Sequence, residues 1–231
     1  RVEYAPTEDC RRLLMAGGRW DPEQLLSDYR QRELRDFLPV ETAQAVQQAR
    51  QALAETGNGQ ECDLVLDGTC FRELTRLADA VDCPALTDYL RTRIDGVNLC
   101  SAVRARRLRK GPDFLHRVLL EGGSVPPAAL EEAAPADLRE LYAATPLREA
   151  AGLAEGICAG GGSMTALEKQ CDNAVLRLAA KARRTPFGVE TALGYLIAAE
   201  AELIAVRTIM TGRRAGLSAD AIRERLRDIY G

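Results

Sequence analysis

"LGYLIAAEAELIAVRTIMTGRRAGLSADAIRERL", from Leu193 to Leu226, contains the most hydrophobic helical pattern in this chain of 231 residues. Glu200, Glu202 and Arg207 interrupt its apolar first half. A membrane-spanning helix needs about 20 predominantly apolar residues with few or no charges, so this stretch is not a membrane span. Charges inside such a helix predict polar contacts with a neighbouring helix or with a partner.

Helical spacing continues along the rest of the chain, and strand patterns are nearly absent. A proline at the start and a Gly-Pro pair at the end delimit a long helix from Pro84 to about Lys110. Thr165–Glu168 predicts a capping box, and Ser218 predicts an N-cap. The chain is therefore predicted to be all-α. The long helix is expected to bury a stripe that consists of Leu86, Leu90, Ile94 and Val97.

Four pairs of matching stretches occur in the same order and indicate an internal repeat of roughly 100 residues. Separations of 106 and 103 residues, in the last two pairs, are expected to differ through small loop changes. The pairs are "LLMAGGRWDPEQL" (from Leu13) with "VLLEGGSVPPAAL" (from Val118), Leu66–Ala80 with Leu167–Lys181, Tyr89-Leu90 with Tyr195-Leu196, and Val103-Arg104 with Val206-Arg207.

These matches predict the domain organisation. Residues 1–16 are expected to be the tail of a truncated first repeat, 17–121 and 122–211 two helical repeats, and 212–231 a C-terminal closing helix. The chain begins at Arg1 rather than at a methionine, so it is expected to be processed or truncated. Repeats of this length exceed the roughly 34 to 47 residues of common helical solenoids. We expect a few domain-sized copies around a pseudo-symmetry axis.

The composition argues against several classes of protein. The net charge is -3, so no global field recruits nucleic acid or anionic lipid. There are 7 cysteines, an odd number without CxxC spacing, which predicts reduced thiols, no disulfide and no zinc site in a cytosolic protein. No signal-peptide pattern is present.

Signatures of catalysis are also missing. The sole histidine, His116, has no cysteine or acid at metal-ligand spacing. "GGGSMT", from Gly160, lacks the lysine of a phosphate-binding loop, and neither GxSxG nor HExxH occurs. We expect no catalytic residue, no cofactor and no metal. An alternative function is nucleic-acid binding through "RARRLRK", Arg104–Lys110, a basic helix end that could contact phosphates.

The stretch from Gly194 to Leu226 followed by "RDIYG", together with "IDGVNLCSAVRARR" and "LLEGGSVPPAAL", resembles the C subunit of the prokaryotic V/A-type rotary ATPases, whose eukaryotic counterpart is the d subunit. The resemblance implies a funnel-like all-helical array of three similar domains. It also implies a non-catalytic rotor subunit. Such a subunit lies at the cytoplasmic face of the plasma membrane, peripheral to it, and joins the central-stalk subunits to the membrane rotor ring during proton or sodium transport.

Five polar residues occupy the positions of the family's recurrent D-x-x-N and E-x-x-x-x-R patterns. Two interpretations follow from the sequence: these residues hold adjacent helices together, or they line the axial surface and contact a partner. The first interpretation predicts that Arg207→Ala lowers thermal stability. A generic helical adaptor, without rotor partners, is a further alternative. The five residues are Asp95, Asn98, Arg104, Glu202 and Arg207.

Overall fold

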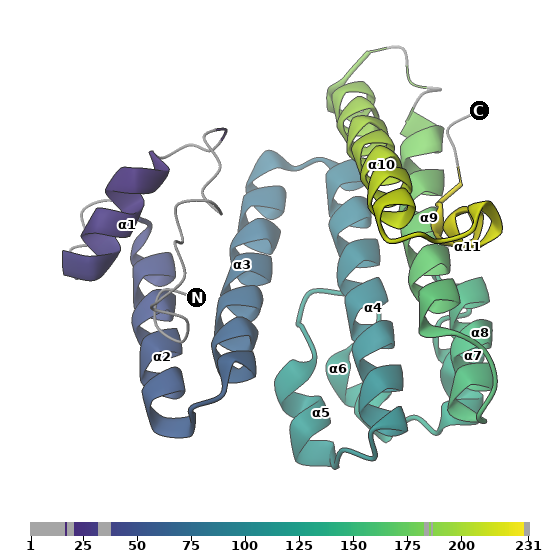
Figure 1. The fold of residues 1–231 in the computed structure, drawn as a ribbon, viewed down its shortest axis with the longest axis horizontal. Coiled ribbons are helices and arrows are strands. Elements are labelled where there is room, and N and C mark those ends of the chain that lie inside the picture. The colour runs from purple at the N-terminus through teal and green to yellow at the C-terminus, as the bar shows by residue number, and fades with distance from the viewer. Residues whose placement is uncertain (1–16, 18–20, 32–37, 183–184, 186, 229–231) are drawn as a thin grey trace. The chain divides into compact units, whose positions relative to one another are not determined.

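The computed structural model describes residues 17, 21–31, 38–182, 185 and 187–228, and its regular elements are all helices (Figure 1). The prediction of an all-α protein is confirmed for this part of the chain. The elements are α1 (Pro22–Gln31), α2 (Val40–Thr56), α3 (Gly59–Val81), α4 (Pro84–Arg107), α5 (Pro112–Val118), α6 (Pro127–Glu132), the 3-10 helix η3 (Pro135–Asp137), α7 (Leu138–Leu141), α8 (Arg148–Cys158), α9 (Met164–Ala182), α10 (Val189–Arg214) and α11 (Ala219–Arg225).

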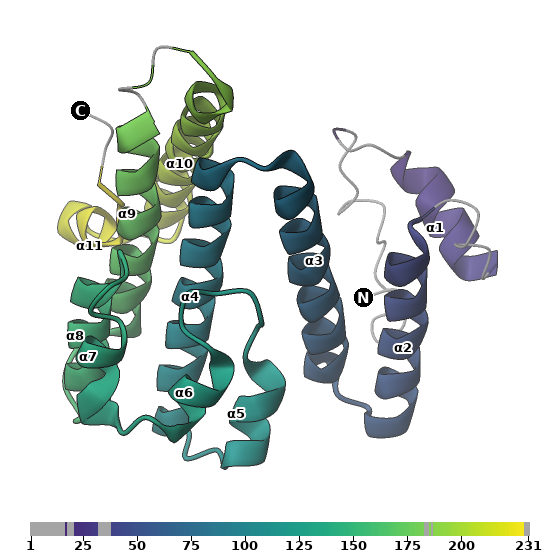
Figure 2. The same cartoon turned by 180° about the vertical axis from the view of Figure 1, so that it is seen from behind.

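The chain divides into two compact units between Cys70 and Phe71. Within the second unit, α4 and α9 lie side by side and antiparallel, α10 and α11 pack on α9, and α8 contacts both α4 and α9 (Figure 1, Figure 2). The shorter α5 and α6 pack near the C-terminal end of α4. Helix α4 therefore occupies the centre of this unit.

The main hydrophobic core belongs to the second unit and joins α4, α8 and α9 to the short helices. Burying such side chains contributes roughly 1.5–3 kcal/mol each before conformational entropy is subtracted. Tyr142 is among the largest fully buried side chains. The other large apolar side chains without solvent exposure in this core are Leu99, Val103, Leu130, Leu138, Leu147 and Leu167.

Two helical hairpins, α3–α4 and α9–α10, share the same internal packing. Each has one buried alanine on its first helix and three apolar residues, four apart, on its second helix. The members correspond at a separation of 101 residues on the first helices and 107 on the second. The first set is Ala78, Leu86, Leu90 and Ile94, and the second set is Ala179, Leu193, Ile197 and Ala201.

The turns that follow α4 and α10 also correspond at a separation of 107 residues. Lys110 N–H donates to the carbonyl of Ala105 at 2.9 Å, and Leu217 N–H donates to the carbonyl of Gly212 at 3.0 Å. Both are the long-range hydrogen bond of a Schellman-type helix end. A short helix follows each turn at once, α5 in one case and α11 in the other.

These contacts correct the alignment that the sequence suggested within α4 and α10. Both helices are continuous, so no loop can shift the separation from 106 to 103 residues. In the alignment that follows from the packing, Asp95 corresponds to Glu202 and Cys100 corresponds to Arg207. The sequence match had instead aligned Arg104 with Arg207. The boundaries of the proposed repeats stay predictions, and residues 1–16 lie outside the described part of the chain.

Local predictions met mixed outcomes. Ser218 is an N-cap, because its hydroxyl accepts from Ala221 N–H at 3.2 Å. The prediction of a capping box at Thr165 is wrong, because α9 begins at Met164, one residue before Thr165. Ser163 Oγ accepts from Thr165 N–H at 3.2 Å. The prediction that Val97 belongs to the buried stripe of α4 is also wrong, because Val97 is 37% exposed. None of the described helices is both long and apolar enough to cross a membrane.

Candidate partner-contact surface

Two of the predicted polar residues, Asp95 and Asn98, are buried on α4 and hold the segment that follows α5. Asn98 donates through Nδ2 to the Leu120 carbonyl and accepts through Oδ1 from Leu120 N–H, both at 2.8 Å. Asp95 accepts from the N–H groups of Ser124 and Val125, both at 3.1 Å. Four backbone groups without helical partners are thereby satisfied.

The Gly-Gly pair lets this segment approach α4 closely. Gly122 has a left-handed backbone, with φ of 97°. A Cβ atom on Gly123 would lie only 2.3 Å from Asp95 Oδ1. Burial raises the pKa of Asp95, while the hydrogen bonds from Val125 and Ser124 oppose that rise. The backbone of the motif "LEGGSV" thus binds the carboxylate of Asp95.

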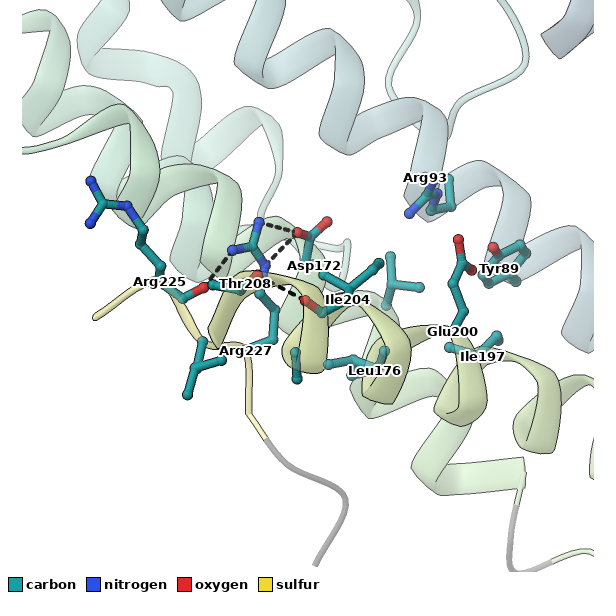
Figure 3. A pocket seen from close by; sticks show the side chains of 14 residues that line it. Tyr89, Arg93, Asp172, Leu176, Ile197, Glu200, Ile204, Thr208, Arg225 and Arg227 are labelled. Atoms are coloured by element: carbon teal, nitrogen blue, oxygen red, sulfur yellow. Dashed lines mark hydrogen bonds and ion pairs between the residues drawn. The ribbon is translucent and has the colours of Figure 1, made fainter. Parts of the chain in front are cut away.

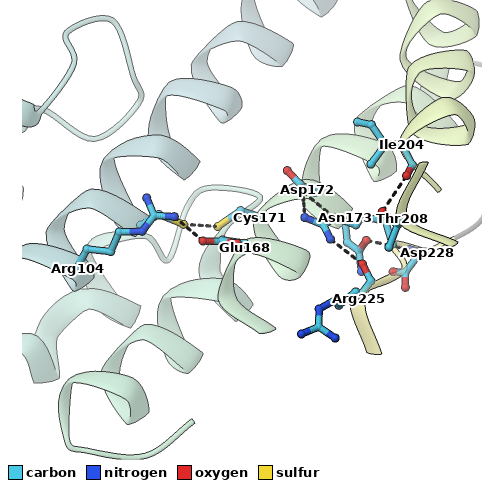
Figure 4. A network of polar contacts seen from close by, with 11 residues as sticks. Arg104, Glu168, Cys171, Asp172, Asn173, Ile204, Thr208, Arg225 and Asp228 are labelled. Atoms are coloured by element: carbon cyan, nitrogen blue, oxygen red, sulfur yellow. Dashed lines mark hydrogen bonds and ion pairs between the residues drawn. The ribbon is translucent and has the colours of Figure 1, made fainter. Parts of the chain in front are cut away.

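A second polar network joins α4, α9 and the chain after α11 (Figure 4). Arg104 forms an ion pair with Glu168 of α9. On the next turns of α9, Asp172 pairs with Arg227 at 2.7 Å, and Asn173 Oδ1 accepts from Asp228 N–H at 2.9 Å. These contacts hold the C-terminal segment against α9.

A solvent-open groove lies beside this network, between α4, α9, α10 and the segment after α11 (Figure 3). Its floor is apolar, with Leu176 and Ile197. Tyr89, Arg93 and Glu200 lie together at one end of it. Burial raises the pKa of Tyr89; the positive charge of Arg93 lowers it and the negative charge of Glu200 raises it. The groove thus combines an apolar floor with a charged end.

Glu202 and Arg207 are exposed on α10, and neither side chain forms an ion pair with another described residue. The structure therefore brings Asp95 and Asn98 together in one contact and Arg104 into another, but leaves Glu202 and Arg207 apart from both. For Glu202 and Arg207 the interpretation as helix-to-helix contacts has no support in the geometry.

The exposed apolar face of α10 was not singled out by the sequence reasoning. Leu196, Leu203 and Met210 recur at seven-residue intervals, and Val206 lies three residues after Leu203. This is the a/d spacing of a coiled-coil seam. That spacing was readable from the sequence, but exposure was not. We call this face the α10 seam; it consists of Leu196, Leu203, Val206 and Met210, which are 63%, 70%, 49% and 61% exposed.

Few of the described side chains are arranged as catalytic or metal-binding groups. His116 is exposed and its Nδ1 lies 3.0 Å from Glu131 Oε1. Within the described ranges, no three His, Cys, Asp or Glu side chains are grouped so as to hold a metal ion. The six cysteines located there are all free thiols, and the closest approach that the structure records is 3.9 Å between the sulfur atoms of Cys100 and Cys171.

The exposed apolar seam of α10 on an all-helical scaffold is the kind of surface that marks a protein–protein interaction site. The profile of the ATP synthase (C/AC39) subunit family matches residues 8–225, and the chain belongs to this family. It is 31% identical over 170 residues to the V-type ATP synthase C subunit of one strain of Thermus thermophilus, and equally to that of a second strain of the same species. The alignment covers 72% of this chain and 48% of each relative, so the chain spans about half the length of these curated relatives.

Proposed function

We propose that this protein is a non-catalytic central-rotor subunit of a V/A-type ATPase. It couples the central stalk to the membrane rotor ring during ATP-linked proton or sodium transport. The observation that carries the proposal is the family match over residues 8–225, together with relatives named as the C subunit of V-type ATP synthase. In this role the chain lies at the cytoplasmic face of the plasma membrane and is held there by contacts with other subunits.

The arrangement of the described residues supports a mechanical role. A coupling subunit must hold its shape under load. In the second unit a large hydrophobic cluster joins α4, α8 and α9, and Asp95 and Asn98 fix the segment that follows α5. We extend the proposal to the shape: repeated hairpins of the α9–α10 kind surround a pseudo-symmetry axis as a funnel. The exposed side chains Glu202 and Arg207 are then available to partners.

Capture by partner subunits tests this function. The protein is immobilised and offered the central-stalk and rotor-ring subunits of the same organism. Stoichiometric capture is the expected result, and Glu202→Lys should weaken it at unchanged thermal stability, whereas the matched exposed change Glu140→Lys on α7 should not. A folded chain that captures neither class of subunit contradicts the proposal.

Nucleic-acid binding by Arg104–Lys110 is less well supported. Arg104 is paired with Glu168, and Arg106 donates to the carbonyls of Leu130 and Ala133 at 3.0 and 2.7 Å. Lys110 Nζ also lies 5.5 Å from the centroid of the Phe114 ring, so three of the five basic groups make contacts within the protein. Salt-sensitive RNA or DNA binding by the isolated chain would reverse this assessment.

A further inference from the structure

Cys100 of α4 and Cys171 of α9 meet at the interface between these two helices. Their sulfur atoms lie 3.9 Å apart, and one thiol donates a hydrogen bond to the other (Figure 4). Gly96, one turn before Cys100, permits this close approach, because a Cβ atom there would already lie 3.4 Å from Cys171 Cβ. The two cysteines are 71 positions apart in the chain. Only the packing of α4 on α9 therefore makes them a pair.

A solvent-open cleft reaches this pair of thiols. Its volume is about 280 Å³, and Arg104 and Glu168 line it together with Cys100 and Cys171. A water molecule has a share of roughly 30 Å³ in the liquid, so hydrogen peroxide, which has two oxygen atoms, fits into this space. The two cysteines are only 6% and 7% exposed. The cleft therefore admits a small reactant to the sulfur atoms and holds back a large one.

The surroundings of the two thiols give them different reactivity. Arg104 lies one turn after Cys100 on α4 and forms an ion pair with Glu168 of α9 (Figure 4). The hydrogen bond from Cys171 lowers the pKa of Cys100, burial opposes this shift, and the charge of Arg104 lowers the pKa further. The hydrogen bond to Cys100 and then burial raise the pKa of Cys171. Because the thiolate is the nucleophile, Cys100 is the thiol that reacts first.

The other described cysteines lack this combination of features. Cys158 of α8 is half-buried, and burial raises its pKa, although Arg106 opposes the rise. The thiol of Cys62 donates to the Ala49 carbonyl at 2.9 Å. Among the cysteines that the structure describes, Cys100 and Cys171 are the pair recorded with a sulfur-to-sulfur contact.

We propose that Cys100 and Cys171 are a redox-active dithiol that a hydroperoxide converts into a disulfide, which links α4 covalently to α9. With hydrogen peroxide, the Cys100 thiolate attacks one oxygen: an S–O bond forms, the O–O bond breaks, and the leaving hydroxide takes up a proton to become water. The Cys171 sulfur then attacks Cys100 Sγ: the S–S bond forms, the S–O bond breaks, and the oxygen leaves with the Cys171 proton as a second water.

Two electrons thus pass from the thiol pair to the peroxide. Thiol–disulfide exchange with a reducing thiol returns the pair to its original state. The disulfide closes a loop that contains the four helices α5 to α8, so it constrains the unfolded chain and stabilises the second unit. The inference is independent of the rotor function.

Disulfide mapping tests the linkage. The reduced protein is freed of reductant, treated with hydrogen peroxide and digested without reduction for mass spectrometry. We expect peptides joined through Cys100 and Cys171, and a thermal midpoint raised by roughly 5–15 °C that dithiothreitol restores. Cys100→Ala should abolish both changes. Cys158→Ala, which removes a half-buried thiol of α8, is the matched control and should preserve them.

The order of attack is tested by trapping the sulfenic acid. Cys171→Ala removes the second thiol, so sulfenic acid should accumulate at Cys100, where a cyclic 1,3-dione labels it; Cys100→Ala should leave Cys171 unlabelled. Cys100 should react at least about tenfold faster than Cys158, because each pKa unit changes the thiolate fraction about tenfold. A natively oxidised wild-type protein without the Cys100–Cys171 link, equal labelling of Cys100 and Cys158, or an unchanged thermal midpoint overturns the inference.

Discussion

Asp95 shows how the surroundings of one residue determine its role. Its side chain accepts two backbone hydrogen bonds while fully buried, because the Gly122-Gly123 pair brings the next segment against α4. Glu202, its counterpart in α10, is exposed. The two acids have similar chemistry, so the neighbouring backbone accounts for the difference.

The first prediction concerns Gly123. Gly123→Ala places a methyl group within 2.3 Å of Asp95 Oδ1, so we expect a loss of about 1–3 kcal/mol in the free energy of unfolding. Gly156→Ala is the control, because it lies inside α8 with no atom within 4 Å and should gain up to about 1 kcal/mol. Urea denaturation measures both. Equal effects of the two changes would contradict the close approach.

The second prediction is a pH dependence. Burial raises the pKa of Asp95 above 3.8, although two backbone hydrogen bonds and the charge of Arg91 oppose the rise. A raised pKa in the folded state means that the unfolded chain loses this proton first as pH rises. Relative to Asp95→Asn, the wild-type protein should therefore lose unfolding free energy over the pH range that begins near 3.8 and extends upward from it. Denaturation curves for both proteins across that range test the sign; a difference that grows with pH contradicts it.

At the scale of elements, α4 and α10 end in the same turn with different residues. The residue after the helix cap has a left-handed backbone in both, with φ of 52° at Arg109 and 72° at Gly216. Glycine adopts this conformation without a steric penalty, whereas a residue with a Cβ atom does not. The turn after α4 therefore carries local strain that the turn after α10 avoids.

The third prediction exchanges these residues. Arg109→Gly should raise the free energy of unfolding by up to about 1 kcal/mol, because it removes the strained side chain. Gly216→Arg should lower it by a similar amount, since no neighbouring atom lies within 4 Å of the new Cβ and only the backbone is affected. Thermal and urea denaturation report both changes. A stabilising Gly216→Arg would show that the two turns are not equivalent.

The fourth prediction compares two candidate site residues on counterpart helices. Asn98→Ala leaves Leu120 N–H and C=O without their partners, so we expect a loss of about 1–3 kcal/mol. Arg207→Ala removes an exposed side chain and should change stability by less than about 0.5 kcal/mol. Differential scanning calorimetry tests the contrast. A large loss for Arg207→Ala would restore its interpretation as a helix-to-helix contact.

At the scale of the whole molecule, the two units differ in the core they bury. Among the described residues of the first unit, the buried side chains are Ala43, Ala45, Ala49 and Thr69. The second unit buries many large apolar side chains around α4 and α9. Local stability follows buried apolar contacts, so the two units are expected to open with different free energies.

Hydrogen exchange gives the fifth prediction. Amides in the middle of α2 should exchange through openings of lower free energy than amides in the middle of α4, because α4 is packed on both sides. Mass spectrometry of peptides from Val40–Thr56 and Pro84–Arg107 resolves the two rates. Leu153→Glu, on the surface of α8, serves as a control that should leave both unchanged. Equal protection in the two helices would contradict the difference between the cores.

The helices and several of their caps were predictable from the sequence because they depend on short-range spacing. Ser218, the Pro84 start and the Gly-Pro stop act through the backbone within a few residues. Val97 shows the limit, because a helical stripe predicts which residues share a face but not whether that face is covered. Likewise, matching residue types alone could not decide whether α4 and α10 correspond at a separation of 103, 106 or 107 residues.

The sequence by itself determined the helical class, the exclusion of a membrane span at Leu193–Leu226, and motifs typical of the family that the match over residues 8–225 shows. Only the tertiary structure decided which polar groups are buried. Asp95 and Glu202 occupy equivalent places on equivalent helices, yet one is enclosed and the other exposed. The reason is physical: helix formation depends on neighbours along the chain, whereas burial depends on which distant segment packs against a face.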